Sequence, residues 1–133
     1  MTTDSSDSSD SSGPGSSADA SVERVAPLPP FQPPYYVVVF TSLRTDEDAG
    51  YGETAGRMAD LVREVPGFLG VESARTPGGL GITVSYFESE EAIAEWRRQV
   101  EHRAAQERGR AEWYESFSVH VSKVERSYGF VRE

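Results

Sequence analysis

The sequence predicts an α+β domain of the ferredoxin-like kind, in which a four-stranded antiparallel sheet carries helices on one face. Two observations predict this fold class. Apolar side chains alternate with a period of two in four segments, and they recur with a helical period in two regions between those segments. Along the chain the segments follow the order βαββαβ, which is the order of the ferredoxin-like fold.

The four strands are expected at residues 35–43, 68–75, 80–87 and 114–125. In the first strand Tyr36, Val38 and Phe40 point to one side, and the other side is apolar as well, so both faces of the sheet need cover. A Pro-Gly-Gly turn at residues 77–79 joins the second and third strands as a hairpin. Because two helices cover one face only, we expect a second copy of the chain to cover the other face in a two-fold homodimer.

The first helix is expected over residues 51–65, where the Pro-Gly pair that follows ends it. Ser89 is placed as the N-cap of a second helical region, broken into two segments, in which Trp96 points inward. Five residues of its second segment share one side of a helix: His102, Ala105, Gln106, Gly109 and Trp113. A glycine inside a helix costs about 1 kcal/mol relative to Ala, so we expect a close approach to the backbone at Gly109.

Composition divides the 133-residue chain into one domain and a leader. Residues 1–34 are rich in Ser, Asp and Pro and are expected to be a disordered tail, residues 35–130 form the domain, and residues 131–133 are its end. The chain has no cysteine, which excludes a disulfide framework, a cysteine-based metal site and thiol catalysis.

Charge and hydropathy exclude several classes of partner. The net charge is −9, and the arginines of the second helical region are interleaved with glutamates, so we expect no nucleic-acid partner. The longest apolar run, residues 35–40, is far too short to span a membrane. No secretory signal is visible at the N-terminus, and we expect a cytoplasmic protein.

Three stretches of the sequence resemble a known family. They are YGETAGRMADLVREVPGFLGVESAR, GITVSYFESEEAIAEWRRQVEHRAAQERGRAEWYESF and VERSYGF, and they are similar to the small stand-alone bacterial members of the antibiotic biosynthesis monooxygenase family. The resemblance implies a dimeric α+β barrel with a pocket between sheet and helices in each subunit. Characterised members of the family include enzymes that oxidise aromatic polyketides without metal or flavin and enzymes that degrade haem, and many other members have no known activity.

The haem-degrading branch of the family can be compared residue by residue. Its helical Trp matches Trp96, but the position of its iron-binding His holds Gln106 here. Its first-strand Asn falls near Phe40 or Thr41, and neither reproduces the contacts of an amide. Haem therefore stays an alternative, with His102 as the substitute ligand, and the first expectation is an enzyme without a cofactor.

The resemblance implies a pocket that holds a small aromatic molecule. The catalytic candidates are His102 as a base, because the pKa of a free His lies near neutrality, Gln106 as a hydrogen-bond donor, and Trp96. The residues expected to contact the substrate are Tyr86, Trp113, Arg110 and Phe40.

Each candidate also has a structural interpretation. His102 can be a half-buried residue bonded to Glu101 or to a carbonyl group, and Trp96 can be a core residue. His120 alternates with serines on the last strand and suits a dimer interface or solvent. With only two histidines, no spacing suggests a preformed metal site. A non-catalytic dimeric module that holds a small molecule or a partner protein is the third alternative.

Overall fold

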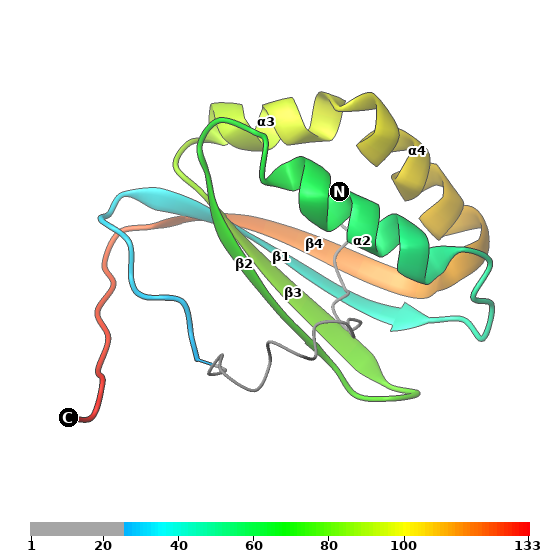
Figure 1. Cartoon of the computed structure of the whole chain (residues 1–133), viewed down its shortest axis with the longest axis horizontal. Helices are drawn as coiled ribbons and strands as arrows, with labels where there is room; N and C mark the ends of the chain where they lie inside the picture. The colour runs from blue at the N-terminus through cyan, green and yellow to red at the C-terminus, as the bar shows by residue number, and fades with distance from the viewer. Residues whose placement is uncertain (1–25) are drawn as a thin grey trace.

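The computed structural model describes residues 26–133, so most of the expected tail, residues 1–25, lies outside the described part (Figure 1). The elements are β1 (Tyr35–Arg44), α2 (Tyr51–Val62), β2 (Phe68–Arg75), β3 (Leu80–Phe87), α3 (Glu90–Arg98), α4 (Val100–Arg108), the π-helical turn η2 (Gly109–Trp113) and β4 (Tyr114–Val124). In residues 26–133 no helix has both the length and the apolar character that crossing a membrane requires.

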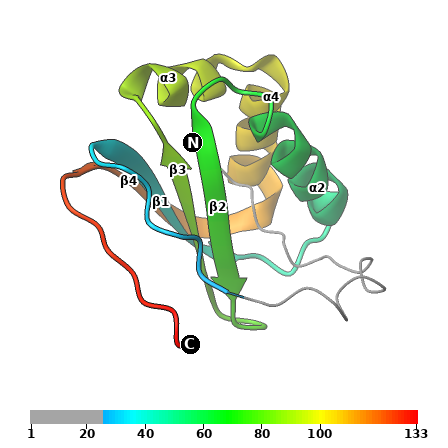
Figure 2. The same ribbon diagram turned by 60° about the vertical axis from the view of Figure 1, so that its left-hand side comes forward.

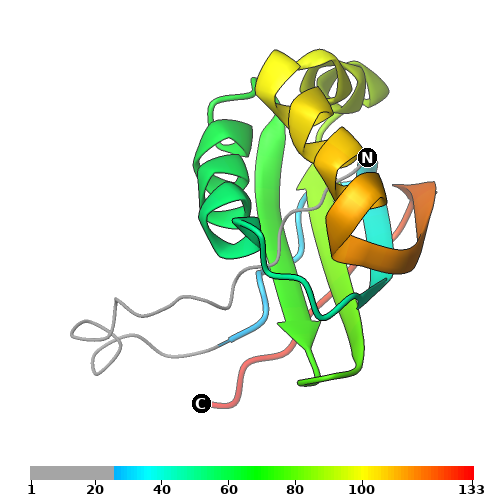
Figure 3. The same ribbon diagram turned by 90° about the vertical axis from the view of Figure 1, so that its right-hand side faces the viewer.

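The sheet is antiparallel throughout, with the strand order β2-β3-β1-β4. All the helices lie on one face of it, as Figures 1 and 3 show. This is the predicted α+β ferredoxin-like fold. The expected broken helix is confirmed as well, because α3 and α4 are separate helices that meet at Gln99.

The helix-facing side of the sheet carries two apolar clusters, because the inward side chains of β1 meet different helices along their length. One cluster packs α2 and α3 against the sheet and includes Val38, Met58 and Trp96. The other lies at the opposite end of β1, where Phe40 packs with Trp113. Burial of these side chains is the main force that holds the helices on the sheet.

The face of the sheet that points away from the helices is called the open face here. Its positions follow from the strand register: Val39 of β1 lies opposite Val84 of β3 and His120 of β4. Residues 26–34 and the chain after Val124 run along this side of the molecule (Figure 2). Within residues 26–133 the open face therefore has no helix over it, and the segments that approach it are residues 26–34 and the chain after Val124.

Candidate functional site between the helices and the sheet

The break between α3 and α4 is made by Gln99. Its backbone is extended (φ −62°, ψ 127°), so it ends α3 and begins α4 at the same position. Its side-chain oxygen accepts a hydrogen bond from the backbone N–H of His102 at 2.8 Å. That bond satisfies one of the free amide groups at the start of α4, which is how an N-cap stabilises a helix.

The break also frees the carbonyl group of Trp96. In an uninterrupted helix this oxygen would accept from the amide four residues later. Here it accepts instead from the backbone N–H of Gln99 at 3.2 Å and lies 3.0 Å from Nδ1 of His102. Since a carbonyl oxygen only accepts, Nδ1 of His102 carries the proton and Nε2 has the lone pair.

His102 is fully buried and stacks on Trp96, with the ring centroids 4.0 Å apart and the planes 14° from parallel. Burial lowers the pKa of His102 to about 3, against a smaller opposing effect of the Trp96 carbonyl. Nε2 has no hydrogen-bond partner among the described residues. The result is a neutral imidazole with one unused acceptor atom inside the protein.

A groove of about 360 Å³ opens between α2 and α4. Its floor comes from both apolar clusters, with Met58, Ala105 and Trp113 nearly or fully buried. Ala105 lies one helical turn after His102 on the same side of α4. An exposed ion pair spans the groove, with Nε of Arg57 2.8 Å from Glu101 Oε1.

The second cluster forms the far end of this region. Trp113 is buried, stands edge-on to Tyr51, and donates from its indole nitrogen to the Ala49 carbonyl oxygen at 3.2 Å. A Cβ on Gly109 would lie 2.9 Å from the ring of Tyr114. The close approach expected at Gly109 is therefore present, and the ring of Tyr114 makes it. The chain widens into a π-helical turn here, a distortion that is frequent at functional sites.

The three remaining predicted site residues, Gln106, Arg110 and Tyr86, belong to neither apolar cluster. Gln106 is half-buried on α4, and Arg110 is exposed with its guanidinium 5.8 Å from the Phe117 ring centroid. Tyr86 lies on the open face, where its hydroxyl donates to Glu72 at 2.8 Å. Burial, with a smaller effect of this hydrogen bond, raises the pKa of Tyr86 to about 12.

The structure thus divides the predicted residues into three places. Trp96 and His102 form a stacked pair in the first cluster, Phe40 and Trp113 lie in the second, and Tyr86 is separated from both by the sheet. Of the features that shape the region, sequence reasoning missed the Gln99 cap, because Gln is not a favoured N-cap residue. It also missed Met58, which reads as an ordinary core residue of the first helix, whereas Ala105 was expected on the same helix side as His102 and Trp113.

No three His, Asp or Glu side chains gather as a potential metal site within residues 26–133. His120 is exposed on the open face, so the sheet separates it from the stacked pair.

The family model for antibiotic biosynthesis monooxygenase matches residues 34–108. The chain therefore belongs to the antibiotic biosynthesis monooxygenase family. Among curated proteins it is similar to the uncharacterised protein YqjZ of Bacillus subtilis (strain 168), with 57% identity over 95 residues that cover 71% of this chain and 83% of that protein.

Two solved structures show the same fold at low sequence identity. SnoaB from Streptomyces nogalater, a cofactor-independent oxygenase, has a TM-score of 0.61 and 12% identity, covering 71% of this chain and 97% of that one. Protein SO0527 from Shewanella oneidensis has a TM-score of 0.60 and 16% identity, covering 68% of this chain and 91% of that one. At these identities the comparison establishes the fold alone.

Proposed function

We propose that the protein is a cofactor-independent monooxygenase that oxidises a small aromatic or polyketide-like molecule in the groove between α2 and α4. The observation that supports this most is the groove itself. Its volume of about 360 Å³ lies within the range of small-molecule sites, and its floor joins both apolar clusters. Family membership and the oxygenase SnoaB among the solved structures of this fold support the reaction class.

The chemistry of the groove favours a neutral ring system. Its floor is formed by apolar side chains, among them the buried Trp113, and such a floor offers no partner for a charged group. Two ion pairs lie at its rim or beside it, Arg57 with Glu101 and Arg108 with Glu112. A substrate with a strong charge of its own would have to compete with these pairs.

In such a reaction the substrate supplies the electrons. Removal of one proton from a phenol or an activated CH₂ group gives a phenolate or enolate, which reduces O₂ and forms a carbon-bound hydroperoxide. Loss of water from the hydroperoxide leaves a carbonyl group. One oxygen atom ends in the product and the other ends in water. All four electrons come from the substrate, either from the two C–H bonds of the CH₂ group or from the ring C–H and the O–H bonds of the phenol.

His102 is fully buried and does not line the groove in this conformation, so it is proposed to take the substrate proton on Nε2 only after the groove floor at Ala105 opens toward it. With a pKa of about 3 it is a weak base in the empty protein. A substrate anion formed beside it stabilises the imidazolium and raises its pKa, so proton transfer becomes favourable only when the substrate is bound. Trp96 holds the imidazole plane, and Gln106 donates a hydrogen bond to the developing anion.

Trp113 provides the apolar wall in this proposal, and Phe40 belongs to the same cluster without lining the groove. Arg110 lies outside the groove, near the edge of β4. Tyr86 is left out because the sheet separates it from the groove. The two-fold homodimer expected from the sequence is part of the same proposal.

Oxygen uptake tests the function. The purified protein is mixed with an anthrone or naphthol series, and uptake is recorded together with incorporation of one ¹⁸O atom from ¹⁸O₂. Ala104→Phe fills the groove and should abolish uptake, whereas Ala111→Phe, an equally exposed position outside the groove, should not. His102→Asn, which keeps a donor for the Trp96 carbonyl but lacks Nε2, should slow uptake at least tenfold. Uptake that is unchanged by both Ala104→Phe and His102→Asn would overturn the proposal.

The alternatives have separate tests. In this conformation His102 offers haem no open coordination position, because it has no exposed surface, and His120 lies on the opposite face. A hemin titration that gives a Soret shift, lost on replacing either histidine, would favour the haem alternative. A protein that binds ring compounds at the groove without any oxygen uptake would favour the non-catalytic module.

A further inference from the structure

Three arginines line one hollow on the surface of the helical layer. The hollow has a volume of about 300 Å³ and lies where α3 ends and α4 begins (Figure 1). Arg97 and Arg98 reach it from the last turn of α3, Arg103 reaches it from the first turn of α4, and Ala94 is its fourth lining residue. It is called the arginine hollow here. Among the described residues that line it, none is acidic, so its side-chain charge is positive.

Two of these arginines have no acidic partner. Arg98 pairs with Glu95, one turn earlier on α3, at 2.8 Å. Glu101, two residues before Arg103, is paired with an arginine of α2 instead. Within residues 26–133, Arg97 and Arg103 form no ion pair. Glutamates and arginines alternate in this part of the sequence, but the helical turns carry the carboxylates to other partners.

The convergence of three guanidinium groups needs a physical reason in a chain whose net charge is −9. Like charges that share a hollow repel one another, and this chain has many carboxylates that could stand between them. The helix ends do not offset the repulsion. The carbonyl end of α3 and the amide end of α4 meet here, so their partial charges oppose each other. A bound anion does offset it.

The geometry of the donors favours a phosphate group over a carboxylate. Each guanidinium presents its N–H groups in a planar fork, and forks on two helices can reach different oxygen atoms of one ligand. A phosphate monoester has three terminal oxygens and about two negative charges, so it can accept from all three arginines. A carboxylate has two oxygens in one plane and a single charge. The volume of about 300 Å³ is at the lower end of the range of small-molecule sites.

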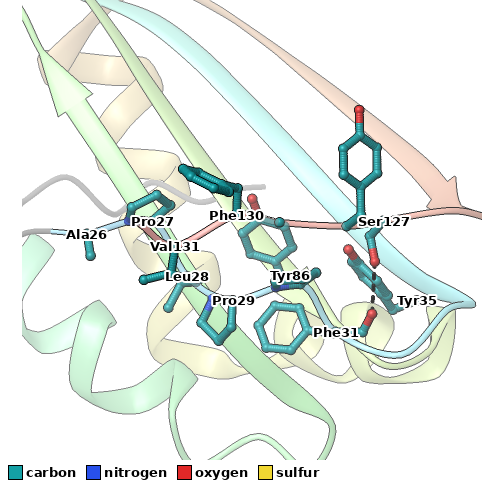
Figure 4. Close-up of a pocket in the computed structure, with 13 residues that line it drawn as sticks. Ala26, Pro27, Leu28, Pro29, Phe31, Tyr35, Tyr86, Ser127, Phe130 and Val131 are labelled. Carbon is teal, nitrogen blue, oxygen red and sulfur yellow. Dashed lines mark hydrogen bonds between the residues drawn. The ribbon is translucent and has the colours of Figure 1, made fainter. Parts of the chain in front are cut away.

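The surroundings of the hollow restrict both the size of the ligand and its place. Glu95 and Glu101 lie on the same helical turns as the arginines, so the hollow is not part of a continuous basic track for a nucleic-acid backbone. Another hollow, of about 670 Å³, lies between residues 26–31 and residues 127–131 (Figure 4). No charged side chain is found among the described residues that line it. Of the two, the arginine hollow is therefore the one suited to an anion.

We propose that the arginine hollow binds a small molecule through its phosphate group, and that this ligand bridges α3 and α4 across the break at Gln99. Arg97 and Arg98 hold the phosphate from α3, and Arg103 holds it from α4. Gln99 is the single residue between the two helices. A ligand that is held on both sides of it therefore fixes the angle between α3 and α4.

The bridge also bears on the stacked pair, because Trp96 belongs to α3 and His102 to α4. Burial is the main cause of the lowered pKa of His102, and the positive charge of Arg97 is a smaller one. The pair thus lies within the electrostatic reach of the hollow, and an anion bound there offsets the effect of Arg97. The site itself does not depend on the oxidation chemistry, which oxygen uptake tests separately.

Isothermal titration calorimetry with pyrophosphate at constant ionic strength tests the site. The parent should bind one pyrophosphate per subunit at millimolar concentration or below. Arg97→Gln and Arg103→Gln should each weaken binding about tenfold, as the loss of a charge-assisted hydrogen bond does. Arg126→Gln is the matched control, because it removes an exposed arginine next to Ser127 of the uncharged hollow, and it should bind as the parent does. A parent that does not bind pyrophosphate, or an Arg126→Gln variant that binds as weakly as Arg103→Gln, overturns the proposal.

Two further measurements test the class of ligand and the bridge. A short single-stranded oligonucleotide and phosphatidylglycerol vesicles are titrated in the same way, and tighter binding of either one than of pyrophosphate overturns the assignment to a small molecule. Amide hydrogen exchange reports on the bridge. Pyrophosphate should slow exchange in residues 99–105 of the parent but not of Arg103→Gln, because only the parent is held from both helices. Pyrophosphate that binds the parent without slowing exchange there contradicts the bridging role.

Discussion

The imidazole of His102 lies flat on the indole of Trp96, with the ring centroids 4.0 Å apart, and is held there by the carbonyl group of Trp96 itself. One residue therefore supplies both the surface on which the ring stacks and the acceptor that fixes its tautomer. The arrangement leaves Nε2 fully buried and without a hydrogen-bond partner in the described part of the chain. A buried acceptor without a partner costs about 1–3 kcal/mol, so its presence indicates a role other than stability.

The pH dependence of stability should reveal this histidine. The pKa of His102 is about 3 in the folded protein, against the ordinary value of 6.5 for a histidine in the unfolded chain. The unfolded state therefore binds the proton more readily than the folded state does. The stability is therefore fully present above pH 6.5 and is lost progressively as the pH falls toward 3. At pH 5 the loss amounts to about 2 kcal/mol.

His102→Phe keeps a stacked ring but does not titrate, so its urea unfolding should lose less free energy than the parent between pH 7 and pH 5. His120→Gln changes an exposed histidine and should follow the parent. If the parent and His102→Phe show the same pH slope, His102 is not buried as a neutral group.

Two helical glycines should respond to alanine in opposite directions. In α2, Gly56 has open space around it, so Gly56→Ala should stabilise the protein by about 0.5–1 kcal/mol. Gly109→Ala places a methyl group 2.9 Å from the ring of Tyr114 and should destabilise the protein by about 1–3 kcal/mol. Thermal unfolding of both variants measures the difference. A Gly109→Ala variant more stable than the parent would contradict the prediction, because it would mean that the π-helical turn and the ring of Tyr114 shift at little cost to admit the methyl group.

The cap at Gln99 should have a measurable effect. Gln99→Ala removes the acceptor of the His102 amide and should cost about 1 kcal/mol of unfolding free energy, as the loss of an N-cap does. Gln32→Ala, at an exposed position ahead of β1, serves as the control. A Gln99→Ala variant as stable as the control would mean that water satisfies this amide equally well.

Adjacent residues on α2 should differ sharply. Met58 is 2% exposed, so Met58→Ala should cost about 2–5 kcal/mol through lost burial and the cavity left behind. Arg57 pairs with Glu101 at the surface, where both side chains are half exposed, and Arg57→Ala should leave the unfolding midpoint unchanged at high salt. Chemical unfolding in 1 M salt measures the stability of both variants. A large loss of stability in Arg57→Ala under these conditions would show that the pair with Glu101 contributes to the stability of the fold.

Local patterns were sufficient for the fold. The hairpin strands β2 and β3 lie at the predicted residues, because alternation and a Pro-Gly-Gly turn specify both a strand and its register. The inward position of Trp96 followed from helical spacing. The first helix was expected to reach residue 65 but ends at Val62, and Val65 is still buried after the chain has left the helix. The helical spacing of apolar residues indicates which side chains are buried, but it does not indicate where the backbone hydrogen bonds of the helix end.

The candidate site was less accessible to sequence reasoning. The shared side of His102 and Trp113 was recognised, but the turn between them is π-helical and places the two residues in different clusters. Tyr86 was grouped with the pocket although its strand directs it to the open face. The bond between His102 and the Trp96 carbonyl joins residues six apart, which no helical period brings together. It exists only because of the break at Gln99.

Because of that break, the stacked pair depends on the number of residues between Trp96 and His102 as much as on the identity of the two side chains. An α-helix turns by about 100° per residue, so one residue inserted or deleted between Gln99 and His102 would swing the imidazole away from the indole. Side chains around the pair can be exchanged while the pair survives, but a change of length in this short connection dismantles it. Among relatives of this fold, the count of residues from Trp96 to His102 is therefore the simplest marker of whether the same buried acceptor is retained.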